Sequence, residues 1–154
     1  MYPYDPERAK ALIAEAKADG VPVDTEVQLV GRIGHFPNAQ EYHEVVAIML
    51  NEIGLNVKLE WFEAAAKNKM QVKPFDPDRR PQIFVDQHDN TAGDPVFTIP
   101  SRWRSDGSQA KISDPELDKL IDEATEATGE DRVAKWKKAA EYIDTLLPLS
   151  LIHI

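Results

Sequence analysis

The densest group of side chains capable of chemistry lies in residues 86–94, where Asp86, His88, Asp89 and Asp94 follow one another closely. Histidine and carboxylate groups this close in sequence can bind a metal ion or carry out acid–base catalysis. The same residue types also form solvated loops with Asx turns and a helix cap. A metal- or carboxylate-dependent enzyme that uses this loop is therefore one hypothesis, but no nucleophile elbow, second histidine motif or glutamate-rich helix supports it.

A second polar group, Arg102-Trp103-Arg104, follows in the same irregular stretch. In a binding cleft, the indole could stack on a ligand while a guanidinium pairs with a carboxylate. The trio could equally be a surface loop with a half-buried tryptophan. The two groups together give the predicted ligand contacts, which are His88, Asp89, Asn90, Thr91, Asp94, Arg102, Trp103 and Arg104.

A third candidate is the segment Gly31-Arg32-Ile33-Gly34, which comes just before an expected helix. Such a loop can present backbone N–H groups to an anion. It lacks the Lys-Ser/Thr pair of a P-loop and the third glycine of a dinucleotide fingerprint. A plain turn is the simpler interpretation.

Composition excludes several classes of protein. The 154 residues suffice for a single domain with its own core, and we predict one domain over residues 1–154. A formal net charge of -9 argues against binding to nucleic acids, because that binding depends on neutralising phosphates with Lys and Arg. The absence of cysteine excludes disulfide scaffolds and thiolate sites. The N-terminus lacks the basic and apolar regions of a signal peptide.

The first half of the chain predicts a βαβ unit. A capped helix is expected over residues 5–17, and a strand over residues 26–30. The next helix should begin after Asn38, which with Glu41 forms a capping box, and it should end at Gly54. Residues 55–61 alternate between apolar and polar, which is typical of a strand with one buried face. Short loops between these elements favour parallel neighbouring strands.

The second half predicts one more strand and a pair of closing helices. A short helix is expected over residues 64–72, a buried central strand over 83–85, and a long irregular stretch over 86–111. Helices should cover residues 115–128 and 131–147, and the apolar tail at 149–154 should form a final strand.

Four helices carry periodic apolar residues that predict which side each one buries. In the first helix the stripe is Ala9, Leu12, Ile13 and Ala16. We expect Trp61 and Trp136 to lie in the core because both are in phase with these stripes. The other stripes are Tyr42, Val45, Val46, Met49, Leu50 and Ile53 in the second helix; Leu117, Leu120, Ile121 and Ala124 in the next-to-last; and Val133, Trp136, Ala140, Ile143 and Leu147 in the last.

Two helices open with the same phrase, Asp5-Pro6-Glu7 and Asp114-Pro115-Glu116, in which Asp caps the helix and Pro takes its first position. With the segments between them, they resemble the C-terminal lobe of the extracytoplasmic solute-binding proteins that serve ABC importers of oligopeptides, dipeptides and nickel (family 5). The stretches that carry the resemblance are residues 4–12, 36–41, 50–57, 82–85, 88–95, 113–118 and 148–151.

The resemblance implies an α/β fold, with a mixed sheet flanked by helices, as one lobe of a periplasmic-binding-protein-like structure. It implies a non-catalytic function, in which a small solute such as a peptide is bound between two lobes and delivered to an ABC permease. No cofactor and no metal are expected. The parent protein would be periplasmic, or extracellular and lipid-anchored, and this chain would be an excised lobe.

Two features modify that expectation. Many peptide-binding members have an aspartate three residues before the Asp94-Pro95 step, where this chain has Thr91, and the family's frequent Gly-Trp pair is replaced by Gln87-His88. The peptide ligand is therefore one option among small solutes. A further alternative is a self-associating module, such as a homodimer that pairs through the face meant for the missing lobe.

Overall fold

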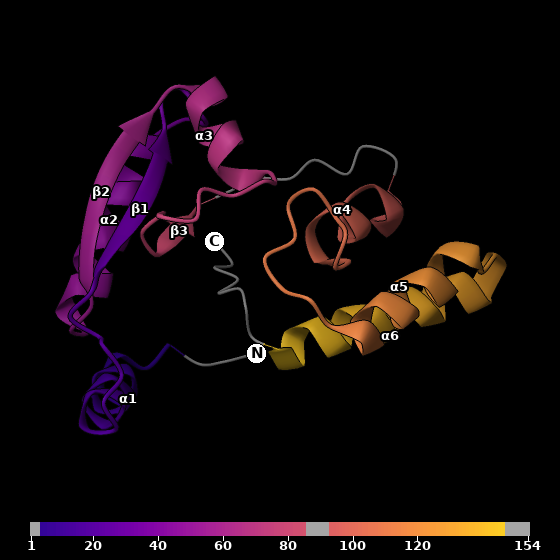
Figure 1. Cartoon of the computed structure of the whole chain (residues 1–154), viewed down its shortest axis with the longest axis horizontal. Coiled ribbons are helices and arrows are strands. Elements are labelled where there is room, and N and C mark those ends of the chain that lie inside the picture. The colour runs from indigo at the N-terminus through magenta and orange to yellow at the C-terminus, as the bar shows by residue number, and fades with distance from the viewer. Residues whose placement is uncertain (1–3, 86–92, 147–154) are drawn as a thin grey trace. The chain divides into compact units, whose positions relative to one another are not determined.

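The computed structural model describes residues 4–85 and 93–146 (Figure 1). The chain forms two compact units, Met1–Gln87 and His88–Ile154. The single domain predicted over residues 1–154 stays a prediction.

The first unit is built on a parallel sheet in the order β2-β1-β3. The α/β class is thus confirmed, and the predicted final strand at 149–154 lies outside the described residues. β1 takes the centre of the described sheet, and β3 lies at an edge, so the prediction of a central strand at 83–85 is wrong for these strands. The bounds are β1 (Glu26–Arg32), β2 (Asn56–Phe62) and β3 (Gln82–Phe84).

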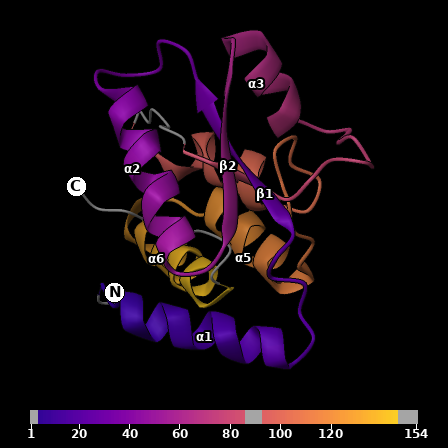
Figure 2. The same ribbon diagram turned by 90° about the vertical axis from the view of Figure 1, so that its left-hand side faces the viewer.

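The two faces of this sheet differ in polarity. In parallel register Val27 faces Val57, Leu29 faces Leu59 and Gly31 faces Trp61, so one face is apolar. Helix α2 (Ala39–Glu52) packs against β1 and β2 on that face, and Figure 2 shows it running alongside the two strands. The opposite face carries polar side chains from all three strands: Glu26, Gln28, Lys58, Glu60 and Gln82.

Helix α2 is turned about its axis from the predicted orientation. Its buried residues are Ala39 and His43, whereas Val45 is 53% exposed and Met49 is 41% exposed, contrary to expectation. The predicted capping box is also absent. Asn38 is the N-cap in a left-handed conformation (φ 58°), which asparagine tolerates, and its side chain makes no cap hydrogen bond.

The remaining helices of the first unit are α1 (Pro6–Ala18) and α3 (Ala64–Gln71). The Asp5 side chain accepts a hydrogen bond of 2.8 Å from the backbone N–H of Arg8, so the predicted cap is confirmed. No residue of α1 is buried and Leu12 is 47% exposed, so the prediction of a buried stripe in this helix is wrong. Helix α3 contacts β1, and its Lys67 is buried.

Asn51 ties the last turn of α2 to the outer edge of the sheet. Its amide nitrogen donates to the carbonyl of Val57 at 3.0 Å, and its amide oxygen accepts from the N–H of Val57 at 2.9 Å. The same nitrogen also donates to the carbonyl of Ala47 at 2.8 Å. One side chain thus satisfies both backbone groups that Val57 turns away from β1.

The second unit consists of short helices followed by a helical hairpin. The irregular stretch predicted at 86–111 contains η1 (Pro95–Phe97) and α4 (Ile99–Trp103), so that prediction is wrong for this part. Helices α5 (Pro115–Glu126) and α6 (Gly129–Leu146) lie side by side and agree with the prediction within two residues at each end. Asp114 caps α5 through hydrogen bonds of 3.0 Å from the N–H groups of Glu116 and Leu117.

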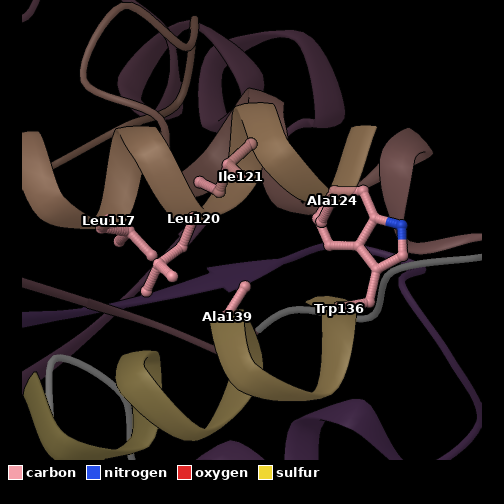
Figure 3. Close-up of a cluster of buried hydrophobic side chains, with 6 residues drawn as sticks. All are labelled: Leu117, Leu120, Ile121, Ala124, Trp136 and Ala139. Carbon is pink, nitrogen blue, oxygen red and sulfur yellow. The ribbon is translucent and has the colours of Figure 1, made fainter. Parts of the chain in front are cut away.

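The core of this unit lies between the two long helices (Figure 3). The predicted stripe of α5 is confirmed in full, because all four of its residues are buried. In α6, Trp136 is buried as predicted, but Ala139 is buried in place of Ala140, and Val133 is 71% exposed. The buried cluster is Leu117, Leu120, Ile121, Ala124, Trp136 and Ala139.

Candidate functional site

The predicted ligand contacts divide between described and undescribed parts of the chain. Asp86 and the contacts His88, Asp89, Asn90 and Thr91 lie outside the described residues. The other four contacts, namely Asp94, Arg102, Trp103 and Arg104, lie in the second unit. The ligand role of all eight stays a prediction.

Asp94 is held by protein partners. Arg132 of α6 donates to both carboxylate oxygens at 2.9 Å, and the N–H of Val96 donates to one of them at 3.0 Å. The Arg132 guanidinium, followed by this backbone donor, lowers the pKa of the Asp94 carboxyl from its ordinary value. The carboxylate is therefore charged and already satisfied before any solute arrives.

Arg132 has a wider structural role than this one pair. It donates hydrogen bonds of 2.8–3.2 Å to three carbonyls at the end of α5, those of Ala124, Thr125 and Ala127. Its guanidinium lies 5.7 Å from the ring of Trp136. Asp94 and Arg132 together fasten the segment around η1 to the α5–α6 hairpin. That contact was not predicted, since Asp94 and Arg132 are 38 residues apart.

The Arg102-Trp103-Arg104 trio is also built into the second unit. Arg104 donates to the two oxygens of Asp122 at 2.9 and 3.2 Å and pairs with Asp106, and these carboxylates raise its pKa. The half-buried Trp103 packs against the α5–α6 core. Of the two interpretations left open by the sequence, these contacts agree with the half-buried tryptophan, but Arg102 and Trp103 lie in helix α4 and not in a loop.

The described residues hold no group of three or more His, Asp or Glu side chains placed to bind a metal ion. Within the same residues, no helix is both long and apolar enough to cross a bilayer.

A polar network crosses one face of the sheet in the first unit. Gln82 donates to Gln28 at 2.8 Å, and Gln28 donates in turn to Glu60 at 2.6 Å. Arg80 donates to both oxygens of Glu60 at 3.0 and 3.1 Å and also pairs with Glu26. The hydrogen bond from Gln28, and then that from Arg80, lowers the pKa of Glu60. A hollow of about 410 Å³ opens beside this network, between α3 and the 74–80 loop.

A second hollow, of about 440 Å³, lies at the carboxyl ends of β1 and β2. Trp61 lines it and is half-buried, so the prediction that Trp61 is a core residue is only partly right. Sequence reasoning named the glycine loop here but missed the aromatic wall. The alternation of β2, which ends in Trp61-Phe62, could have signalled it. The lining residues are Arg32, Ile33, Gly34, Phe36, Asn38, Ala39, Gln40, Glu41 and Trp61.

Comparison with solved structures defines the class of fold. The chain superposes on the substrate-binding domain of an oligopeptide ABC transporter from Bacillus anthracis with a TM-score of 0.72 and 20% identity, over 92% of this chain and 27% of that one. An ABC transporter substrate-binding protein from Sinorhizobium meliloti gives a TM-score of 0.63 at 19% identity, over 92% of this chain and 29% of that one. The fold is that of an ABC-transporter substrate-binding domain.

The chain also has a relative by sequence. The chain is 32% identical over 150 residues to heme-binding protein A of Haemophilus influenzae, and the match covers 92% of this chain and 26% of that protein. The chain thus spans about a quarter of the length of the curated relative. No family model matches the sequence. The resemblance to solute-binding proteins of ABC importers, predicted from the sequence, is confirmed.

Proposed function

We propose that this chain forms one lobe of a solute-binding protein and supplies one wall of the cleft in which an ABC importer's solute is captured. One observation carries the proposal: a substrate-binding-domain fold and 32% identity to a curated relative each extend over 92% of the chain. Capture would follow a hinge mechanism, in which two lobes close because some contacts with the solute form only in the closed state.

The chain has no catalytic step in this proposal. Asp94 and Arg104, the acidic and basic candidates among the described residues, are already engaged by Arg132 and by Asp122 and Asp106. Hydrogen-bonded side chains of this kind support a fixed wall rather than acid–base chemistry, which needs a group free to exchange its proton with a substrate. The names of the similar proteins favour the same reading.

The solute is a small molecule of the kind these importers take up. The similar proteins carry the names oligopeptide transporter and heme-binding protein, so peptides and iron porphyrins are the two classes to test first. In this proposal the parent protein works outside the cytoplasm, in the periplasm or at the cell surface, and delivers its solute to a permease.

Solute uptake tests the proposal most directly. The gene that encodes this sequence would be deleted in its host, and uptake of labelled oligopeptides and of an iron porphyrin would be measured. We expect loss of one of the two activities and its return with a plasmid copy. Unchanged uptake of both would contradict the proposal, as would purified protein that converts the solute to a new product.

Affinity of the purified chain gives a second test. A small-molecule site usually buries most of its ligand, and a single wall cannot do so. We expect dissociation constants on the order of millimolar or weaker for peptides and hemin by calorimetry. Micromolar affinity would contradict the one-wall model. Light scattering over a range of concentrations would test the predicted self-association.

A further inference from the structure

Arg32, the last residue of β1, carries a positive charge that pairs with no carboxylate among the described residues. Its side chain makes no hydrogen bond or ion pair with the described residues, and its Nε is buried. By contrast, Arg80, Arg104 and Arg132 each pair with carboxylates. A partly desolvated cation without a partner costs free energy, and an anionic ligand would recover that cost.

Arg32 lies at the carboxyl end of a parallel strand, where ligands of α/β proteins commonly bind. It lines the 440 Å³ hollow at the carboxyl ends of β1 and β2. In open α/β sheets, ligands bind in crevices outside the carboxyl ends of the strands. The hollow lies entirely within the first unit, so its walls come from elements whose contacts are defined.

One wall of the hollow is aromatic and rigid. Trp61 packs against Gly31 so closely that a Cβ on Gly31 would lie 2.6 Å from the indole ring. On another side, the ring of buried His43 lies 5.1 Å from that of Trp61 and 6.0 Å from that of Phe36. Because these neighbours fix the rings, Phe36 and Trp61 offer a preformed surface for a flat ligand.

The charges around the hollow favour one negative group rather than several. The first turn of α2 contributes to the lining, and the Asn38 side chain does not cap it. Its positive dipole end therefore adds to the Arg32 charge. Glu41 also lines the hollow and opposes them.

By strand alternation Arg32 belongs to the polar face and Trp61 to the apolar face, and both line the hollow at the ends of the strands. We propose that this hollow binds a monocarboxylate carried on a flat aromatic body that reaches around the strand ends, with the carboxylate on Arg32 and the ring system against Trp61 and Phe36. The inference deepens the proposed function by naming a class of solute, and its biological meaning rests on that function. The binding itself does not depend on an importer.

The test uses the purified full chain and three probes: 2-naphthoate, the neutral 2-naphthalenemethanol, and acetate. Amide and indole shifts in NMR spectra would report where and how tightly each binds. We expect naphthoate to bind most tightly and to shift the Trp61 indole and the first turn of α2. Naphthoate that binds no more tightly than the neutral probe would overturn the proposal, as would the absence of binding up to about 10 mM or shifts confined to other residues.

Variants separate the charge from the aromatic wall. Arg32→Gln should weaken naphthoate binding about tenfold, the loss typical of one charge-assisted pair, and leave the neutral probe unchanged. Glu41 is exposed, so Glu41→Gln should leave the fold and the contact with Arg32 in place. Because the variant removes a negative charge that repels the carboxylate, it should tighten naphthoate binding severalfold. Arg79→Gln is the matched control, because Arg79 stacks on Phe75 and lines the other hollow. Naphthoate affinity that is equal in wild type and Arg32→Gln would refute the assignment.

The outcome is independent of the uptake experiment. Loss of uptake in the deletion strain with no naphthoate binding would keep the importer function and reject this hollow. Naphthoate binding with unchanged uptake would support this hollow as a binding site and reject the importer function.

Discussion

The α5–α6 hairpin of the second unit and the βαβ segment of the first unit use their side chains differently. In the hairpin, the apolar stripe of α5 is buried and Arg132 is bound to Asp94 and to three carbonyls. In the βαβ segment, Val45 and Ile48 of α2 are exposed and Arg32 has no partner among the described residues. Within the described residues, the arginine of the hairpin is thus engaged by other protein groups, whereas the βαβ segment exposes apolar residues of α2 and leaves the Arg32 side chain unpaired.

Substitution in the α5 stripe should have the largest effect. Leu117 is fully buried between α5 and α6, so Leu117→Ala should lower the free energy of unfolding by about 2–5 kcal/mol through lost burial and a residual cavity. Urea denaturation would measure it. The matched control is Ile48→Ala in α2, which is 57% exposed and should change stability by less than about 0.5 kcal/mol. Equal losses for the two variants would erase the contrast between the helices.

A methyl group on Gly31 should have the next largest effect. Its Cβ would meet Trp61 at 2.6 Å, so Gly31→Ala should cost about 1–3 kcal/mol through overpacking. In a Trp61→Leu background the cost should fall, because the crowded ring is absent. A cost that persists without the indole would place the strain elsewhere.

Arg132→Lys should lower the melting temperature of the second unit while retaining the charge. A lysine cannot reproduce the two-pronged contact with Asp94 and also reach three carbonyls of α5, because it lacks the planar fork. Near-UV circular dichroism of Trp136, next to the guanidinium, would follow the local change. Lys138→Arg, on the exposed face of α6, should have no such effect.

Acid should weaken the ion pair between Asp94 and Arg132. The folded-state pKa of Asp94 is lowered, so its contribution to stability is present above the ordinary aspartate pKa of about 3.9 and is lost as the pH falls toward the folded value. The melting-temperature difference between wild type and Asp94→Asn should therefore be largest near neutral pH and shrink below about pH 4. A difference independent of pH would show that the carboxylate charge is irrelevant.

The smallest effect is expected at Arg32. Because the Arg32 side chain makes no ion pair or hydrogen bond with the described residues, Arg32→Met should change the free energy of unfolding by less than about 0.5 kcal/mol or raise it. Thermal denaturation of Arg32→Met and Arg132→Met side by side would show whether one arginine serves the fold and the other does not. A large loss for Arg32→Met would assign it a structural role.

Sequence reasoning predicted the helix and strand order because local signals agree with the fold. The Asp-Pro-Glu helix starts and the alternation of residues 55–61 depend on neighbours in sequence. Such local signals could not predict which side of α2 is buried. Apolar residues occur on several of its sides, including Val45, Ile48 and Leu50, so periodicity alone does not say which side meets the sheet.

The site was harder to predict for a different reason. Residue types suggested that Asp94 and Arg104 were available to a ligand, but each is engaged by a distant partner, Arg132 or Asp122, that only the tertiary structure brings close. Conversely, Trp61 was expected in the core because it falls on the apolar positions of the alternating strand 55–61. It sits where the strand leaves the sheet, so it forms the wall of a hollow.

The amide of Asn51 has a consequence for how the sheet ends. Exposed edge strands invite pairing with strands from other molecules, and proteins protect them by various devices. At β2, the side chain of Asn51 occupies the N–H and the carbonyl of Val57 as an incoming strand would. An added strand would have to displace this mimic and break both hydrogen bonds, so lateral growth of the sheet is blocked at that point by a single side chain.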